Sequence, residues 1–478
     1  MSTASQLKRE IGLFSAVAVV VANMVGTGIF TTSGFILQEV GDSTMLLLGW
    51  LIGGAFALCG ALCYGELGAR YPQAGGEYVY LREAFGKPVA FLSGWISLIV
   101  GFSAPIAASA IAFATYLLSA AGMSTDTNGA VGLSDGSIFR ISPSIMLAIS
   151  VVLLISLLHI HSLRAGSRVQ NLLTVFKIAL IVGFIGAGFF SSGGSVTHFS
   201  KDIISFESIL DGRFAVALIF ISFAYSGWNA AAYLGAEIKR PSRNIPLAML
   251  LGTLIVTGLY LLLNLVYVYA LPAHEMRGVM EVAAAAGTRL FGPGIGRWVN
   301  GAISLGLLSV LSAMILAGPR VYYAMSRDGI FFPLFATISD RRHTPAHAIG
   351  LQAIIAVIMI VSASYDKLLI YIGFTLSLFA MLTVIGLMRL RRGQGGSAPA
   401  YRTWGYPITP LLFILGNLWI IYCSLKSRPE PVVWGVATIA LGFVVYAYFY
   451  RCRPELRGPK RVNSSASGNL LSDRGNTK

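Results

Sequence analysis

The sequence is short of charge. Only 12% of its 478 residues are Asp, Glu, Lys or Arg, whereas soluble domains carry about 25%. From Gly12 to Leu37 there is no charged residue at all. Runs of about 20 apolar residues are long enough to span the hydrocarbon core of a bilayer, and such runs recur along most of the chain. The composition therefore excludes an ordinary soluble domain and predicts an all-α polytopic membrane protein.

Cysteines and the residue sets of membrane enzymes are also scarce. The spacing of the four cysteines, which lie in or beside apolar runs, predicts neither a disulfide nor a metal site. The sequence contains no HExxH motif and no pair of aspartates inside an apolar run, and a membrane enzyme would need such convergent groups. We therefore expect no enzymatic activity, no cofactor and no metal.

About twelve apolar runs have the length of a membrane-spanning helix. They cover residues 12–37, 44–68, 89–119, 141–160, 168–190, 213–237, 246–271, 296–325, 346–364, 367–389, 406–425 and 431–450. The formal net charge is +15, and most basic residues collect in alternate connecting segments and in the C-terminal tail. This distribution follows the positive-inside rule, so it predicts that both termini are cytoplasmic. The positive charge then reflects topology, and we expect no binding of nucleic acid.

Two of the apolar runs are interrupted by glycine. The first run begins near Gly12 and breaks at Gly26, in VGTGIF. The sixth begins near Gly212 and breaks at Ser226-Gly227, also fourteen residues from its start. Each glycine costs about 0.8–1 kcal/mol of helix stability relative to alanine. Transporters often consist of inverted repeats with broken helices at matching positions, although glycine can also serve close helix packing.

The matching interruptions predict two repeats of five spans. The predicted units are a cytoplasmic N-terminus at 1–11, repeats at 12–190 and 211–392, spans 11 and 12 at 406–450, and a disordered cytoplasmic tail at 451–478. An unwound segment within a membrane is tolerated where it lines a cavity or is covered by protein. The half-helix after the break presents N–H groups to a carboxylate, and the half-helix before it presents carbonyls to an ammonium. The first break thus predicts a site for an amino acid zwitterion.

Several motifs resemble the amino acid/polyamine/organocation (APC) superfamily, and more narrowly its L-type amino acid transporter branch with its bacterial relatives. The motifs are GTGIF at 26–30, PQAGGEYVYLREAFG at 72–86, FAYSGWN at 223–229, PRVYYAMSRDG at 319–329 and YRTWGYP at 401–407. The resemblance runs from about residue 8 to 450. It implies a multi-pass protein of the cell membrane with a LeuT-like fold, in which access alternates around a site near the membrane midplane.

The resemblance also implies which positions bind the substrate. The family's carboxylate-binding backbone falls on Gly26, Thr27 and Gly28. The aromatic residue that covers the substrate matches Phe223, and a polar residue often found near it matches Asn229. The family's amino-group contacts fall on carbonyls around Ala22, Asn23, Phe223, Ala224 and Ser226. Ser226 stands where many relatives have glycine, so the preferred substrate side chain does not follow from the resemblance.

Lys177 is the one basic residue deep within an apolar run. A lysine at the bilayer centre costs about 2.5–3.5 kcal/mol on insertion scales. Because no deep carboxylate is present, we expect it to contact carbonyls of the first broken helix and hydroxyls such as Ser309 and Ser312. In the resembled family a lysine here replaces the cation of sodium-coupled relatives, which implies a sodium-independent carrier. It is either a fixed structural cation, which suits an exchanger, or a group that loses its proton and couples transport to protons.

Other polar residues lie near the predicted cytoplasmic ends of spans. Glu66 and Glu237 have basic residues close in sequence, so we expect ion pairs or gate contacts, with a proton relay as the alternative. His159 and His161 are predicted to be interfacial.

The expected substrate is a neutral amino acid, because the deep parts of the spans, away from their ends, hold neither a carboxylate for a cationic side chain nor a second basic residue, besides Lys177, for an anionic one. The predicted function is sodium-independent transport of neutral L-amino acids, as exchange. The alternatives are a proton-coupled amino acid or polyamine symporter and, from another class, a non-transporting amino acid sensor. Eukaryotic L-type carriers join a glycoprotein through a cysteine between spans three and four. Residues 120–140 contain no cysteine, so we expect no disulfide-linked partner, and only the lipid bilayer and the amino acid as partners.

Overall fold

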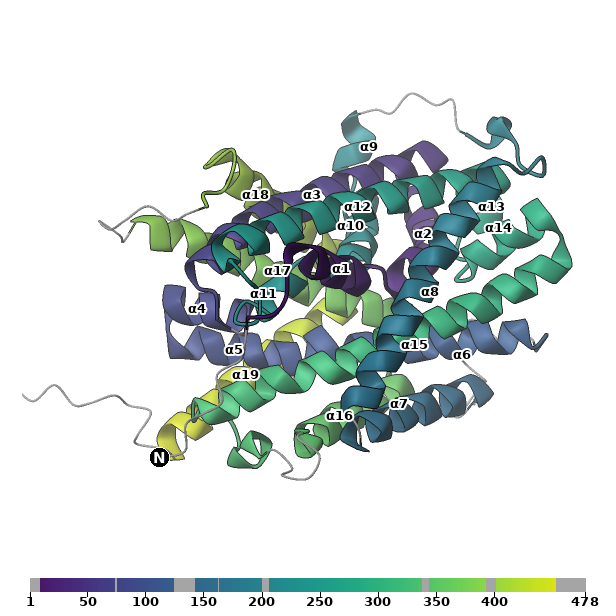
Figure 1. Cartoon of the computed structure of the whole chain (residues 1–478). Coiled ribbons are helices and arrows are strands. Elements are labelled where there is room, and N and C mark those ends of the chain that lie inside the picture. Colours follow the sequence, from purple (N-terminus) through teal and green to yellow (C-terminus); the bar gives the residue numbers. More distant parts are fainter. Residues whose placement is uncertain are drawn as a thin grey trace, which may run out of the picture.

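The protein is an all-α bundle (Figure 1). The computed structural model describes residues 9–73, 75–123, 142–161, 163–199, 206–337, 344–392 and 401–452, without the side chains of 163–170, 206, 324, 336 and 452. The described residues form no strand, and their one isolated parallel bridge joins Ile11 to Ile238. Two segments discussed above lie mostly outside the described residues: the loop at 120–140, which has no cysteine for a partner, and the predicted tail at 451–478.

The helices follow the order of the predicted spans. Those of the first half are α1 (Leu13–Met24), α2 (Thr27–Val40), α3 (Ser43–Arg70), α4 (Glu77–Phe85), α5 (Lys87–Ile96), α6 (Ala104–Ala120), α7 (Pro143–His161) and α8 (Leu163–Phe189). Those of the second half are α9 (Phe206–Leu210), α10 (Gly212–Tyr225), α11 (Ala230–Tyr233), α12 (Pro241–Ala270), α13 (Ala273–Met276), α14 (Val282–Phe291), α15 (Pro293–Arg327), α16 (Ala346–Ser362), α17 (Tyr365–Arg392), α18 (Ile408–Ser427) and α19 (Pro429–Cys452).

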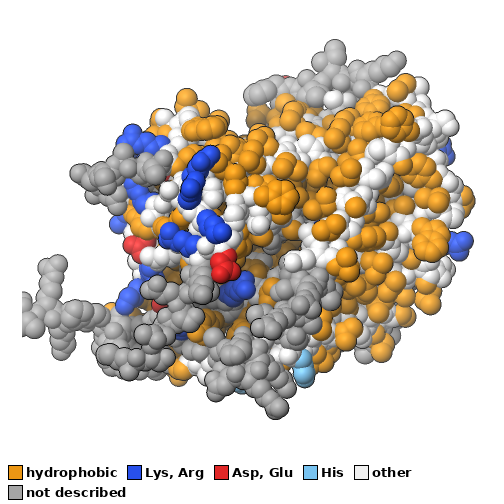
Figure 2. Space-filling view, in the orientation of Figure 1, with side chains coloured by type: hydrophobic (Ala, Val, Ile, Leu, Met, Phe, Trp, Pro, Cys, Tyr) orange, Lys and Arg blue, Asp and Glu red, His pale blue; other side chains and the backbone are white. Residues whose placement is uncertain are grey.

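The lengths of these helices suit a membrane. Within the described residues, nine helical segments are long and apolar enough to cross it, and the bent pair α1–α2 makes a tenth. α10 and α16, at the predicted sixth and ninth spans, are shorter apolar helices. Hydrophobic side chains cover the middle and right of the face in Figure 2, whereas most of its Lys and Arg side chains gather at the left. The prediction of an all-α polytopic membrane protein is confirmed.

The third span contains an irregular turn. It runs from Lys87 to Ala120 through α5 and α6, and a π-helical stretch, Ser97–Ser103, joins the two helices. The stretch ends just before Pro105, which has no backbone N–H to donate. π-Helical turns are often found at functional sites. Ser97 and Gly101 of this stretch line the central cavity described below.

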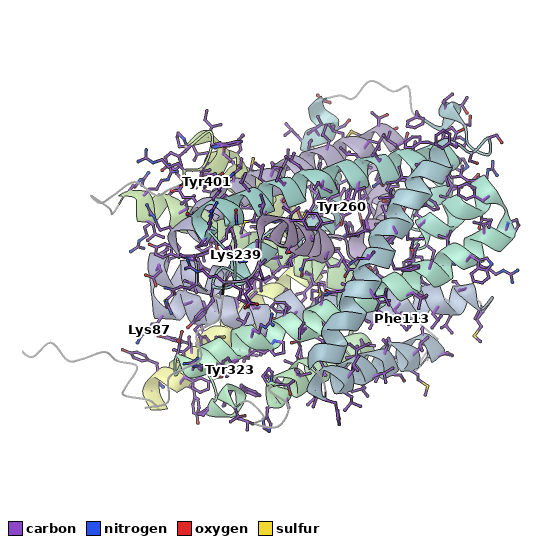
Figure 3. The ribbon with its side chains drawn as sticks, viewed as in Figure 1. Lys87, Phe113, Lys239, Tyr260, Tyr323 and Tyr401 are labelled. Atoms are coloured by element: carbon purple, nitrogen blue, oxygen red, sulfur yellow. The ribbon has the colours of Figure 1, made fainter. Side chains whose placement is uncertain are left out.

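One end of the bundle carries most of the basic residues, and we call it the basic end. Lys87, Lys239 and Tyr323 mark it at the left of Figure 3. Backbone bonds also join the two broken helices at this end. Ile11 N–H donates to Glu237 O at 3.0 Å, and Lys239 N–H donates to Ile11 O at 2.9 Å.

Glu66 lies at the basic end and forms an ion pair, as predicted, but across the bundle rather than with a sequence neighbour. Its Oε1 accepts from Nε of Arg391 at 2.7 Å, and its Oε2 accepts from the backbone N–H of Thr403 at 2.8 Å. The Glu66 side chain is fully buried. This pair joins α3 to the end of α17.

The opposite end of the bundle is closed around α2. The hydroxyls of Thr31 and Tyr365 are 2.8 Å apart, and Tyr116 donates to Phe30 O at 2.7 Å. The segment that joins α13 to α14 lies against α2, because the Gly278 N–H donates to Gly34 O at 2.9 Å. These contacts connect α2 to α6, α14 and α17 on this side of the two breaks.

Candidate functional site

The two predicted breaks are present and contact each other. α1 ends at Met24 and α2 begins at Thr27, with a bend of 42° between them. α10 ends at Tyr225, and Gly227 has a φ of +100°, which an L side chain rarely adopts. A Cβ on Gly227 would lie 2.9 Å from the Asn23 carbonyl carbon. The second break therefore needs glycine both for its backbone angle and for its contact with the first.

The first turn of α2 packs against the end of α10. A Cβ on Gly28 would lie 2.4 Å from Ala224 Cα, where ordinary van der Waals contact begins at 3.4 Å. Glycine at this position lets the two backbones approach closely. The positive end of the α2 dipole is thereby placed beside the last carbonyls of α10.

Tyr260 of α12 connects both breaks. Its hydroxyl lies 2.6 Å from Met24 O and 3.1 Å from Ala224 O, which are the acceptors at the ends of α1 and α10. Tyr260 is fully buried and lies beside α1 in the middle of the bundle (Figure 3). Sequence reasoning missed it, because one tyrosine within an apolar run carries no signal of its partners.

A cavity of about 950 Å³ lies beside the breaks. Asn23 and residues 222–223 and 225–230 form one wall. Another wall includes Gly101 of the π-helical stretch, Ala313 and Ala317 of α15 and Leu376 of α17. The cavity extends to charged residues of the basic end, which include Glu77, Arg82, Glu237, Arg320 and Asp328. The bundle is thus hollowed from the breaks toward the basic end, while the α2 contacts described above lie on the other side.

The nine residues predicted to bind substrate divide into two groups. Asn23, Phe223, Ser226 and Asn229 line the cavity. Ala22, Gly26, Thr27, Gly28 and Ala224 lie at the breaks but outside the cavity lining. Thr27 bonds to the Ser109 hydroxyl at 2.6 Å. Backbone carbonyls of this group bond to Tyr260 and Lys177.

Lys177 is buried between α8, α1 and α15. Its Nζ donates to Ala22 O at 3.1 Å, near the end of the first half-helix. Its Cβ is 3.6 Å from where a Cβ on Gly306 of α15 would lie. A carbonyl of the first broken helix is the kind of partner that the sequence predicts for this ammonium.

The predicted hydroxyl partners of Lys177 bond elsewhere. Ser309 donates to Gly306 O at 2.8 Å, and the Ser312 hydroxyl lies 2.8 Å from Nε2 of His159. The side chain of His159, which was predicted to be interfacial, is fully buried between α7 and α15. Its position near the end of an apolar run does not reveal that its ring faces a serine of another helix.

A carboxylate outside the predicted spans also lines the cavity. Glu77, the first residue of α4, lies in the motif at 72–86 and is only 8% exposed. Burial raises the pKa of its carboxyl group, while hydrogen bonds from Tyr64 and Asn229 act in the opposite direction. The sequence analysis did not select Glu77 as a site residue. The signal that could have pointed to it is a glutamate directly after two glycines in a polar connecting segment. Among the described residues, no group of three or more His, Cys, Asp or Glu could hold a metal ion.

Comparison with known proteins identifies the family. The amino acid permease family matches residues 11–450. The serine/threonine exchanger SteT of Bacillus subtilis is 31% identical over 92% of this chain and 96% of its own length. The mouse b(0,+)-type amino acid transporter 1 is 31% identical over 93% of this chain and 88% of its own. The human large neutral amino acids transporter small subunit 2 is 30% identical, with coverages of 93% and 80%. The chain belongs to the amino acid permease family, within the APC superfamily, and is a multi-pass transporter of amino acids rather than an enzyme.

Proposed function

We propose that this protein exchanges neutral L-amino acids by alternating access and without sodium, in the cell membrane. The observation that carries the proposal is the pair of interlocked breaks beside a cavity that extends toward one end of the bundle only. The positive-inside rule assigns the basic end and both termini to the cytoplasm. The structure then corresponds to an inward-facing state. The match between the two breaks supports inverted repeats at 12–190 and 211–392.

The polarity of the breaks supports a zwitterionic substrate. The start of α2 has the positive end of a helix dipole, which favours a carboxylate. Carbonyls at the ends of the preceding half-helices favour an ammonium. Close to the breaks the cavity is lined by uncharged side chains such as Phe223, Ser226 and Asn229, which supports a neutral substrate. The similarity to a serine/threonine exchanger of Bacillus subtilis supports exchange of small neutral amino acids.

Sodium independence is supported by Lys177. Its Nζ lies at a carbonyl of the first broken helix, and an ammonium there supplies a positive charge that a sodium-coupled carrier would take from the ion. The same contact favours a second candidate function. The described partner of Lys177 is a neutral carbonyl rather than a carboxylate. No described ion pair therefore holds the proton of this ammonium. Release of that proton during the cycle would make the protein a proton-coupled symporter.

Uptake of labelled amino acids into proteoliposomes tests these functions. The panel should contain neutral, cationic and anionic amino acids and a polyamine, with and without unlabelled amino acid inside, at matched pH and without sodium. We expect uptake that requires an internal neutral amino acid. Accumulation driven by an inward proton gradient alone would replace exchange by symport. Specific binding without flux would identify a sensor.

The proposed function includes no disulfide-linked partner, because residues 120–140 contain no cysteine. Reducing and non-reducing electrophoresis of the protein from native membranes tests this. A band that shifts to higher mass only without reductant would contradict it.

A further inference from the structure

Glu77 is anchored to the second break through one of its two carboxylate oxygens. Its Oε1 accepts from the Tyr64 hydroxyl of α3 at 2.8 Å and from Nδ2 of Asn229 at 2.9 Å. Asn229 follows Gly227 in the unwound segment and lines the cavity. The two bonds therefore fix the carboxylate at the boundary between the central part of the cavity and its basic end.

The second oxygen of Glu77 has no partner among the residues that the structure describes. The titratable side chains that face this carboxylate are phenols: Tyr64 of α3, Tyr80 of α4 and Tyr233 of α11. None of the described lysines or arginines forms an ion pair with it. Glu77 lines the cavity, so Oε2 is the carboxylate atom left to meet a molecule there. A buried carboxylate without a cation favours the arrival of one.

We propose that Glu77 binds the ammonium group of the amino acid on the basic-end side of the cavity, as the substrate enters or leaves the site between the two breaks. The proposal rests on the proposed function, since an amino acid must pass along this cavity. An ammonium carries three donors and can reach Oε2 while Tyr64 and Asn229 hold Oε1. Hydrogen bonds between ionised groups are about twice as strong as neutral ones. Glu77 thereby sets the affinity for substrate on one side of the membrane only.

A merely structural role for Glu77 makes a different prediction. The dipole of α4 stabilises a carboxylate in its first turn. The bonds of this carboxylate to Tyr64 and Asn229 also join α4 to α3 and to the second break. If that were its whole role, its replacement would impair transport from both sides and lower stability. An ammonium site affects the Michaelis constant from one side and depends on the carboxylate charge.

The experiment measures exchange from each face of proteoliposomes whose protein orientation has been determined. The probe is the neutral amino acid that wild type exchanges fastest, and the variants are Glu77→Gln, Glu77→Asp and, as a matched control on the exposed face of α4, Glu83→Gln. We expect Glu77→Gln to raise KM at the basic-end face by about tenfold. KM at the other face and the maximal rate should stay within about twofold. Glu77→Asp should retain part of the affinity, and Glu83→Gln all of it.

The pH profile of wild type gives a second readout that does not depend on folding of a variant. Protonation removes the charge that the ammonium needs, and burial makes the Glu77 carboxyl bind its proton at higher pH than a free glutamate. KM at the basic-end face should therefore rise as the pH falls through the raised pKa of Glu77, above the range where an ordinary glutamate takes up its proton, and Glu77→Gln should show no such rise.

Three results would overturn the inference: equal effects on both faces, no effect of Glu77→Gln, or a pH profile shared by wild type and Glu77→Gln. If wild type exchanges no amino acid, the proposed function fails, and this inference fails with it. Normal wild-type exchange with an unaffected Glu77→Gln refutes the ammonium site alone.

Discussion

Replacement of Gly28 by alanine tests whether the close approach of the two breaks is required for transport. The added Cβ would lie 2.4 Å from Ala224 Cα and 2.6 Å from Ala224 Cβ. Ordinary contact begins at 3.4 Å, so the first turn of α2 and the end of α10 must separate by about 1 Å. The obstacle is backbone, which cannot turn aside as a flexible side chain can.

The expected magnitude follows from the cost of overpacking. Extra carbon atoms in a well-packed interior cost about 1–3 kcal/mol. If this cost destabilises only the substrate-bound arrangement of the two breaks, the affinity for substrate drops roughly 5- to 150-fold. The separation of α2 from α10 should also weaken the bonds that the Tyr260 hydroxyl makes at the ends of α1 and α10.

The assay compares exchange kinetics and thermal stability of Gly28→Ala with those of Gly258→Ala. Gly258 lies within α12, and a Cβ there would meet nothing within 4 Å, so its alanine variant should match wild type or be slightly more stable. Wild-type kinetics for Gly28→Ala would refute the reasoning, because the breaks would then tolerate a wider separation.

Three further predictions concern charged residues. Lys177→Met removes the bond to Ala22 O, and since hydrogen bonds from charged groups contribute about 1.5–3 kcal/mol, exchange at low substrate without sodium should fall roughly 10- to 150-fold; unchanged exchange would contradict a role at the first break. Glu66→Gln removes the buried charge that pairs with the partly exposed Arg391. The melting temperature of this variant in detergent should therefore fall clearly, while that of the exposed Glu83→Gln stays near wild type. Burial raises the pKa of Glu281, whose carboxylate accepts from Ser119 at the closed end. The proton therefore stabilises the closed arrangement below the ordinary glutamate pKa, and this stabilisation is lost as pH rises through the raised pKa. Accessibility of a cysteine label at the closed end should accordingly increase with pH in wild type and stay constant in Glu281→Gln.

The sequence allowed the spans and both breaks to be predicted, because each depends on a local pattern. Apolar length sets a span, and glycines at Gly26 and Gly227 interrupt it. The predicted sixth span at 213–237 was too long, since the helix ends at Tyr225 and only the short α11 follows. The break at Ser226-Gly227 was predicted, but the apolar run after it does not show that the helix following the break is only four residues long.

Contacts between distant segments could not be predicted in the same way. The bonds of Tyr260 to two half-helices, and of Glu77 to Asn229, join residues far apart in sequence. The burial of His159 could not be predicted for the same reason, since it depends on how α7 packs against α15. Residue spacing reveals which helix face a side chain occupies, but not which helix covers that face.

The backbone pairing of Ile11 with Ile238 reduces the number of independent motions open to the two broken helices. They are joined at this pairing on the basic end and again in the middle, where Gly227 contacts the backbone of Asn23. Two points of attachment prevent rotation about either one, so α1 and the segment from Ser226 to Ile238 turn as one lever. A single angle between that lever and the rest of the bundle then describes how far the basic end opens. Spectroscopic labels placed within the lever should keep a constant separation through the cycle, and labels placed across its edge should report the whole motion.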